Sequence, residues 1–414
     1  MYIKSLFLLA IVVFSGIVIP ALGDAEGLDF DFFGGGPSSY DSYSLSRSCR
    51  NKNFITLPLG TAGGLDESNL SAFLLARKDN NVFVALDAGN IWSGISKYIS
   101  ARNLASIFDI QYPAYAKTTD QKAAWFLRNH IAGYMAGHSH LDHLEGLIEN
   151  SAEDALSYTH LNYGITDGIL SMIQPYLAPN TTAGVLRRKP ILGLNSTLQA
   201  IDIHLFNNII WPDLALYGRY SYNVLTNAST QNFAAASGWN VNANIAGTIF
   251  ANMDVSTFET CHNDIFSTAF LFTDQITGEQ FVFFSDTGIP SGTYNCDWKQ
   301  RIHNVWAQVK IDKLRAVYLE VSFPNSTPDA SMFGHVRPKD VLALLDDLVD
   351  LSVQTTPFTE SLSHVKLIVQ HIKPYANAAT FTIPVSKVIE NELKAGNTHN
   401  IQVVIPEQGV PICF

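Results

Sequence analysis

The stretch GYMAGHSHLDHLEGLIENS, residues 133–151, holds three histidines and an aspartate within six positions. The full chain of 414 residues has only 12 histidines, so their density here is unusual. The cluster consists of His138, His140, Asp142 and His143. An apolar run precedes it and the helical pattern LEGLIEN follows it, so we expect the cluster to form a loop between a strand end and a helix start.

Imidazole and carboxylate groups at this spacing are suited to divalent metals. Zn²⁺ binds histidine nitrogen and aspartate oxygen, and a catalytic zinc site keeps one position open for water. His138 and His140, two residues apart on an extended turn, can point to one side. Asp142 and His143 can point to another, so one loop can serve two neighbouring metals. A solvated, histidine-rich loop is the alternative interpretation.

The composition is that of a compact globular protein, with 47% hydrophobic and 15% charged residues. The formal net charge is -11. Phosphate backbones and anionic lipids select basic surfaces, so this charge argues against a polynucleotide or a membrane surface as the main partner. It leaves room for a small phosphorylated substrate, since a bound metal can reverse the local field.

The amino-terminal residues resemble an export signal. A short basic start is followed by the apolar run Leu6–Ile19, and Pro20–Gly23 supplies a turn and small residues for cleavage. We therefore expect a signal peptide at 1–23 and a flexible linker at 24–50, with the protein exported to a periplasm or secreted. An uncleaved membrane anchor is the alternative, although the run is short for a membrane span. No other stretch could cross a bilayer.

The chain has four cysteines, which are Cys49, Cys261, Cys296 and Cys413. Export would place them in an oxidising compartment where disulfides form. Three complete pairings are open, and the sequence does not choose among them. The cysteines form no C-x-x-C pair, which argues against a thiolate metal site.

Short apolar runs alternate with helical patterns from about residue 54 onward, which predicts an α/β layered fold. We expect one domain over 51–414, with an elaboration at about 151–250 where the sequence is rich in Asn, Thr and Ala. A helix with a proline near its start is expected at RPKDVLALLDDLVDL. The expected strands are NFITLPLGT, NNVFVALDAGN, the run that ends AGYMAG, GEQFVFFSDTGIP, LRAVYLEVSFPN and HVKLIVQHIKP.

The motif H-x-H-x-D-H after a strand resembles the signature of the metallo-β-lactamase superfamily. The narrower form HSHLDHLEGL is similar to that of the class II cyclic-nucleotide phosphodiesterases, and HLFNNIIWPDL, residues 204–214, resembles a second stretch of that family. The resemblance covers about residues 54–406. It implies a four-layer αβ/βα sandwich of the metallo-β-lactamase type and two divalent metal ions, with zinc expected and manganese or iron as alternatives.

The resemblance also implies ligands outside the histidine loop. His262 in ETCHND matches a later single histidine, Asp286 in FFSDTG matches the aspartate that bridges the metals, and His371 in LIVQHIKP matches a last histidine at a strand end. Asp87 matches an aspartate that braces the loop. His204 competes for the third-histidine role and is expected to contact substrate or pack. The implied ligands are His138, His140 and His262 for one metal, Asp142, His143 and His371 for the other, and Asp286 for both.

Glu320 in YLEVSFPN and His335 in MFGHVRPKD match a glutamate and a histidine that act together as a proton donor in relatives with this fold. An imidazole steadied by a carboxylate can protonate a leaving alkoxide near neutral pH. The expected catalytic set is therefore His335, Glu320 and the ligand Asp142. A capping glutamate and a helix-start histidine are the alternative interpretations.

The expected activity is hydrolysis of a 3′,5′-cyclic nucleotide, cyclic AMP with cyclic GMP as a second candidate, to the 5′-nucleotide. One alternative is another hydrolase on this fold: a lactonase, thioesterase, β-lactamase or RNA 3′-processing nuclease. The other is an exported, metal-dependent nucleotide-binding protein that is not an enzyme. A small-molecule substrate is expected, with no polynucleotide and no stable membrane anchor. From the resemblance alone, the middle segment is a candidate dimerisation surface for a homodimer.

Overall fold

The computed structural model describes residues 49–101, 107–154, 188–239, 245–290, 295–354, 361–374 and 381–414. All of them belong to one compact unit, Tyr40–Phe414. The expected signal peptide, all but the last two residues of the expected linker, and His160 lie outside the described residues. The elaboration expected at about 151–250 stays a prediction, because much of that range is not described.

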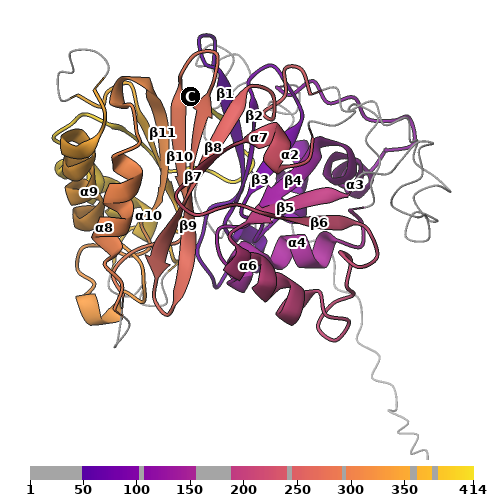
Figure 1. Ribbon diagram of the computed structural model, residues 1–414, viewed down its shortest axis with the longest axis horizontal. Coiled ribbons are helices and arrows are strands. Elements are labelled where there is room, and N and C mark those ends of the chain that lie inside the picture. Colours follow the sequence, from indigo (N-terminus) through magenta and orange to yellow (C-terminus); the bar gives the residue numbers. More distant parts are fainter. Residues whose placement is uncertain are drawn as a thin grey trace, which may run out of the picture. The chain divides into compact units, whose positions relative to one another are not determined.

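Two mixed sheets form the centre of the fold, and each has seven strands (Figure 1). The first sheet comprises, in spatial order, β14 (Ile412–Cys413), β1 (Phe54–Gly60), β2 (Ala72–Arg77), β3 (Phe83–Leu86), β4 (Ile131–Met135), β5 (Lys189–Gly193) and β6 (Tyr220–Val224). The second comprises β13 (Gln402–Val404), β12 (Lys366–Gln370), β11 (Leu314–Glu320), β10 (Gln280–Phe284), β9 (Ile265–Asp274), β8 (Met253–His262) and β7 (Ser229–Asn232).

Helices cover the outer face of each sheet (Figure 1). The first sheet is covered by α2 (Trp92–Ser100), α3 (Thr119–His130), α4 (Glu145–Asn150) and α6 (Asn195–Ala200). The second is covered by α8 (Trp298–Trp306), α9 (Pro338–Leu351) and α10 (Val385–Ala395). The short helix α7 (Phe233–Ala236) packs its Phe233 between the sheets. Four layers result, so the expected αβ/βα sandwich is confirmed.

The short helical turns are the 3₁₀ helices Glu67–Asn69, Leu141–His143, Ile311–Lys313 and Asp329–Ser331, and the π-helix Ile201–Leu205. None of the helices within the described ranges is long and apolar enough to span a bilayer.

Three apolar cores hold the layers together. The core between the sheets is rich in aromatic side chains, such as Phe73 of β2 against Phe283 and Tyr318 of the second sheet. The two outer cores lie between each sheet and its helices. Strand β10 is buried along its whole length because its alternate side chains enter two different cores. This explains the continuous apolar run FVFF that follows Gln280.

The strand directions bring the polar residues of the candidate site to one edge. Strands β3, β4 and β5 are parallel in the first sheet, and β10, β11 and β12 are parallel in the second. The carboxyl ends of parallel strands meet at the same edge of a sheet. Asp87 follows β3, Asp286 closely follows β10, Glu320 ends β11 and His371 follows β12. His262 ends β8, which runs in the same direction as β10 because both are antiparallel to β9.

Two disulfides resolve the pairing that the sequence leaves open. Cys49 is joined to Cys413 beside the β1–β14 pair, and Cys261 at the end of β8 is joined to Cys296. The first links the start of the described chain to its carboxyl terminus. The second lies directly beside His262.

Candidate metal centre

The histidine loop leaves β4 and passes close under the second sheet. A Cβ atom on Gly137 would lie 2.1 Å from Cβ of Ser285, so only glycine allows this approach. The Gly137 amide donates to Oδ1 of Asp87 over 2.8 Å, and its carbonyl accepts from Thr268 Oγ1 over 2.6 Å. Contacts from both sheets therefore fix the start of the loop.

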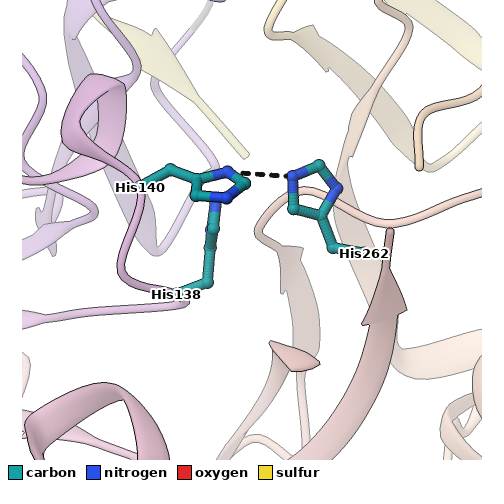
Figure 2. A group of neighbouring side chains, drawn as sticks. All are labelled: His138, His140 and His262. Atoms are coloured by element: carbon teal, nitrogen blue, oxygen red, sulfur yellow. Dashed lines mark hydrogen bonds between the residues drawn. The ribbon is translucent and has the colours of Figure 1, made fainter. Parts of the chain in front are cut away.

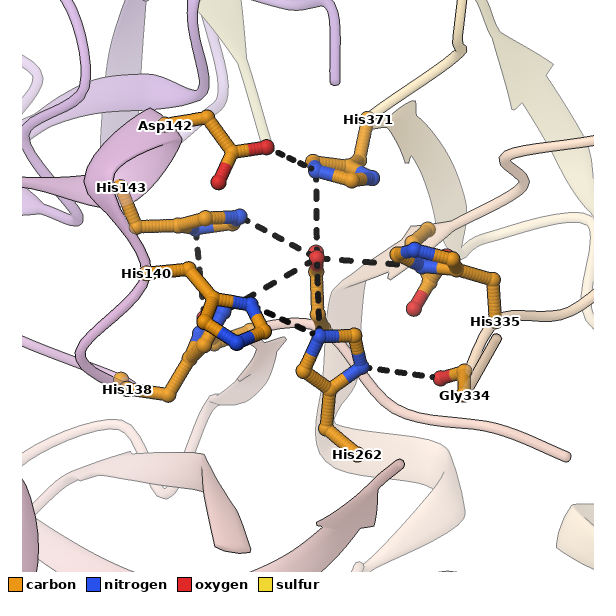
Figure 3. Close-up of polar contacts among 12 residues, drawn as sticks. His138, His140, Asp142, His143, His262, Gly334, His335 and His371 are labelled. Carbon is orange, nitrogen blue, oxygen red and sulfur yellow. Dashed lines mark hydrogen bonds and ion pairs between the residues drawn. The ribbon is translucent and has the colours of Figure 1, made fainter. Parts of the chain in front are cut away.

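Side chains from the second sheet face the loop (Figure 3). Asp286 is almost fully buried, and its Oδ2 lies 3.2 Å from Nε2 of His143 and 3.1 Å from Nε2 of His371. The same oxygen lies 3.8 Å from Nε2 of His262 and 4.0 Å from Nε2 of His138. One carboxylate thus lies close to histidines from both halves of the sandwich.

Hydrogen bonds determine which nitrogen carries the proton in two of these imidazoles. Nδ1 of His143 lies 2.7 Å from Oδ2 of Asp87, and Nδ1 of His262 lies 3.0 Å from the carbonyl oxygen of Gly334. Both oxygens only accept, so Nδ1 must donate in each case. Nε2 of His143 and Nε2 of His262 consequently face the centre of the cluster.

Two serine hydroxyls act in the same way on two further imidazoles. Ser285 donates to Oδ2 of Asp87 over 2.6 Å and presents its oxygen to Nδ1 of His138 at 3.0 Å. Ser322 donates to Glu320 over 2.5 Å and presents its oxygen to Nδ1 of His371 at 2.9 Å. Nε2 of His138 and Nε2 of His371 are therefore directed inward, where Nε2 of His371 lies 3.1 Å from Oδ2 of Asp142 and 3.1 Å from Oδ2 of Asp286.

The donor set fits divalent metal ions. Figure 2 shows His138, His140 and His262 in one group, with Nδ1 of His140 3.1 Å from Nε2 of His262. Within the described part of the chain, Nε2 of His138 and Oδ1 of Asp286 are buried without a hydrogen-bond partner. Converging lone pairs and carboxylate oxygens require positive charge between them, and buried orphan acceptors are what a cation satisfies.

Potential ligand atoms lie within 4.8 Å of one another in several overlapping groups. These groups are His138–His140–His262, His138–His143–Asp286, Asp142–His143–His371 and His262–Asp286–Glu320–His335. The structure thus brings together all seven residues expected as ligands, together with the expected proton-donor pair. It places Asp87 beneath the loop, in contact with His143, Ser285 and Gly137.

The pKa values of the site residues follow from burial and from the carboxylates. Burial lowers the pKa of His138 and lowers that of His262 to about 4, so both imidazoles are neutral at neutral pH, as metal binding requires. Burial also disfavours a charged His143, but Asp286 and Asp87 outweigh it and raise the pKa of His143. A bound cation can replace the proton that these carboxylates attract.

Glu320 and His335 form a buried pair next to the cluster. Nδ1 of His335 lies 2.8 Å from Oε2 of Glu320, whose Oε1 accepts from the Thr287 amide over 2.7 Å. Burial raises the pKa of Glu320, with a further contribution from Asp286, and burial lowers the pKa of His335. The pair therefore favours one shared proton over two separate charges.

Three histidines lie outside these ligand groups. His204 is exposed on the π-helix Ile201–Leu205 and is absent from the ligand groups above. His303 lies 2.9 Å from Asp347, and His364 lies 3.0 Å from the Ile311 carbonyl oxygen. The substrate or packing role of His204 stays a prediction.

The residues that sequence reasoning missed are Ser285 and Ser322. Each precedes or follows an acidic residue of the site, in FFSDTG and YLEVSFPN. That adjacency is the only available signal, since serine is common at strand ends and its partners, His138 and His371, are distant in sequence.

Comparison with known proteins gives a consistent result. A family model described as cAMP phosphodiesterases class-II matches residues 50–409. The chain is 44% identical over 388 residues, 91% of this chain and 86% of the relative, to cAMP/cGMP-dependent 3′,5′-cAMP/cGMP phosphodiesterase A of Dictyostelium discoideum. It is 29% identical to the 3′,5′-cyclic-nucleotide phosphodiesterase of Aliivibrio fischeri, over 89% of this chain and 96% of that protein.

Among solved structures, that of unliganded yeast PDE1 matches with a TM-score of 0.65 and 19% sequence identity, covering 88% of this chain and 100% of that chain. At this identity the likeness concerns the fold.

Proposed function

The chain belongs to the class II cAMP phosphodiesterases, and from this premise we propose how its residues hydrolyse a 3′,5′-cyclic nucleotide. The observation that carries the proposal is the convergence of Nε2 atoms of histidines from both sheets around the buried Asp286 carboxylate. The Glu320–His335 pair lies immediately beside it. Cyclic AMP and cyclic GMP are the proposed substrates.

We propose two divalent ions as cofactors and zinc as their identity, because all ligands are histidine nitrogens and aspartate oxygens. His138, His140 and His262 would hold one ion, Asp142, His143 and His371 the other, and Asp286 would contact both. When bound, the ions activate water as a nucleophile and neutralise charge on the phosphate. Asp87, Ser285 and Ser322 keep the ligand imidazoles in the tautomer that this requires.

The reaction forms a bond between phosphorus and a water oxygen and breaks the bond between phosphorus and O3′ of the ribose. The departing O3′ needs a proton. Glu320 occupies Nδ1 of His335, so Nε2 of His335 is the nitrogen that we propose as its donor. Thr287 and Ser322 hold the Glu320 carboxylate in place through their amide and hydroxyl groups. The product is the 5′-nucleotide.

We propose that the protein acts outside the cytoplasm. Two disulfides support this, because such bonds persist in oxidising compartments. The apolar amino-terminal stretch with its small-residue end is the second support. The expected homodimer stays a prediction.

The decisive experiment measures metal content and cyclic AMP hydrolysis for the wild type, for His140→Ala and for His303→Ala. We expect the wild type to contain two metal equivalents and to form 5′-AMP, and His140→Ala to lose metal and activity together. His303 lies in a surface ion pair with Asp347, so His303→Ala serves as the matched control and should retain both. Full activity and metal content in His140→Ala would contradict the proposed site.

A substrate panel distinguishes the alternative functions. Faster turnover of a β-lactam, a lactone, a thioester or an RNA 3′ end than of cyclic AMP would favour another hydrolase on this fold. Tight binding of cyclic AMP by metal-loaded protein without formation of 5′-AMP would favour a binding protein.

A further inference from the structure

A basic side chain, Lys373, lies at the edge of the metal centre. Lys373 follows His371 by two residues, and the described residues offer its ammonium group neither a hydrogen bond nor an ion pair. The nearby Arg337, in contrast, is fully engaged by Asp340, Asp329 and the Thr327 carbonyl. In an acidic protein, a cation with no hydrogen bond or ion pair to any described residue is unexpected.

The backbone around Lys373 is fixed. Its amide donates to the carbonyl oxygen of Ser322 over 3.2 Å, and the adjacent Ile372 carbonyl accepts from Gly63 over 3.2 Å. Ser322 also contacts Glu320 and His371. The backbone of Lys373 is therefore hydrogen-bonded to Ser322, the residue whose hydroxyl group also contacts Glu320 and His371.

The side chain of Lys373 reaches toward the site along the Gly64 turn. Gly64 has a φ of +63°, and a Cβ atom on it would lie 4.0 Å from Nζ of Lys373 and 4.0 Å from Oδ2 of Asp142. The ammonium group and a ligand carboxylate thus face the same small space. The absence of a side chain at Gly64 leaves this space open.

The charge of Lys373 acts on the reacting groups. After burial, which is the largest cause, Lys373 is among the charges that lower the pKa of His335 and of His371. It also counters the rise in the pKa of Glu320 that burial causes. The geometry at Gly64, where Nζ of Lys373 and Oδ2 of Asp142 lie 4.0 Å from the same point, places the ammonium group where it can attract a phosphate at the metal centre.

We propose that Lys373 binds a phosphate oxygen of the cyclic nucleotide and of the 5′-nucleotide product, an inference that rests on the proposed function. A lysine ammonium is a compact point charge and a common phosphate ligand. The cyclic diester carries one negative charge, whereas a phosphomonoester carries nearly two at neutral pH. Lys373 therefore contributes more to product affinity than to substrate affinity.

The test compares Lys373→Gln, Lys373→Arg and the control Lys366→Gln, all as metal-loaded full-length protein. Lys366 is the first residue of β12, the strand that precedes His371 and Lys373, and lies at the end away from His371. The measurements are kcat and KM for cyclic AMP, the inhibition constant of 5′-AMP, metal content and Tm. We expect Lys373→Gln to raise KM about 10- to 100-fold, since a charge-assisted hydrogen bond is lost, and to raise the inhibition constant of 5′-AMP further. Lys373→Arg should stay within about fivefold of the wild type, and Lys366→Gln should not differ from it.

An unchanged KM and 5′-AMP inhibition constant in Lys373→Gln, with full metal content, would overturn the proposal. So would a loss of metal in Lys373→Gln that Lys373→Arg shares, because that result indicates a structural role. If the wild type cleaves no cyclic nucleotide, the proposed function fails separately. Calorimetric titration of the metal-loaded proteins with inorganic phosphate then still decides on Lys373, because only Lys373→Gln should bind phosphate more weakly.

Discussion

The two halves of the sandwich contribute to the metal centre in different ways. The first sheet supplies His138, His140, Asp142 and His143 from a single loop, which follows one strand. The second sheet supplies His262, Asp286 and His371 from the ends of three separate strands. The ligands of the first half are therefore close together because they are near one another in the sequence. Those of the second half are close together because their strands end at the same edge of the sheet.

The two halves also brace their ligands differently. In the first half a single residue, Asp87, holds the loop amide of Gly137, the imidazole of His143 and the hydroxyl of Ser285. In the second half the corresponding work is divided between the carbonyl of Gly334, which fixes His262, and Ser322, which fixes His371. Backbone strain occurs on both sides, since Asp87 and His371 have φ values of +51° and +57°. Non-glycine residues hold such conformations where the surrounding structure requires them.

Asp286→Ala should have the largest effect, because its carboxylate lies within 4.0 Å of two ligand histidines from each half. We expect kcat/KM for cyclic AMP to fall by at least about a thousandfold, as both positioning and charge stabilisation are lost. Metal analysis should show a deficit in the same preparation.

The control for this experiment is Asp297→Ala, which removes an exposed helix cap of α8 that lies in the same half. It should cost stability only, about 1 kcal/mol. If Asp286→Ala kept kcat/KM within tenfold of the wild type, the two halves would not share a centre.

The same difference between the halves determines how much of the site can be predicted from the sequence. The histidine loop can be predicted because its four ligands lie within six residues of one another. Strands such as β10 and β12 can be predicted because burial on both faces gives them apolar runs. The ligands from the second half are reached only through family resemblance. Nothing local distinguishes His371 from His364, and only the parallel register of β11 and β12 brings His371 to the site.

The secondary structure in the middle of the chain is difficult to predict for a different reason. Strands β6 and β7 are edge strands whose residues are mostly half-exposed or exposed. The alternation of β6, YSYNV, covers only five residues, and β7, STQN, has no apolar residue, so neither forms the long apolar pattern that identifies a strand. The contacts of Ser285 with His138 and of Ser322 with His371 also cannot be predicted from the sequence, because each joins residues that are far apart in the chain.

The two disulfides provide a second test of the difference between the two halves of the sandwich. Removing the first, as Cys49→Ser with Cys413→Ser, should lower the free energy of unfolding by about 2–5 kcal/mol and leave kcat/KM unchanged. Removing the second, as Cys261→Ser with Cys296→Ser, should also lower activity. The reason is that the Cys261 carbonyl accepts from Thr287 Oγ1 and the Gly288 amide, which follow Asp286.

Denaturant unfolding and steady-state kinetics on the two double variants measure both effects. Equal activity loss in the two variants would show that the second half does not depend on its own cross-link.

The bracing residues give the third test. Asp87→Asn keeps a residue type that tolerates positive φ, so its effect isolates the carboxylate charge and its hydrogen bonds. We expect about a 10- to 100-fold loss of metal affinity or activity for Asp87→Asn and a smaller loss within that range for Ser322→Ala. Metal titration followed by kinetics checks this order, and Asp66→Ala, an exposed cap in the first half, is the control. A larger loss for Ser322→Ala would reverse the assignment of Asp87 as the principal brace.

The smallest expected effect concerns a histidine of the first half that lies outside the centre. His130 is buried, its Nδ1 donates to the Asn81 carbonyl over 2.9 Å, and burial lowers its pKa from 6.5 to about 4, to which the charge of Lys189 adds. Between these two pKa values the unfolded chain binds more protons than the folded chain, so stability falls as the pH falls. His130 alone should cost about 1 kcal/mol between pH 7 and about pH 5.5.

Comparing unfolding of the wild type with that of His130→Gln at both pH values isolates this contribution from that of the ligand histidines. Glutamine retains an amide donor for the Asn81 carbonyl but does not titrate. The difference in unfolding free energy between the two proteins should therefore change by about 1 kcal/mol in favour of His130→Gln at the lower pH. An unchanged difference would mean that His130 binds protons alike in the folded and unfolded states and contributes nothing to the acid sensitivity of the fold.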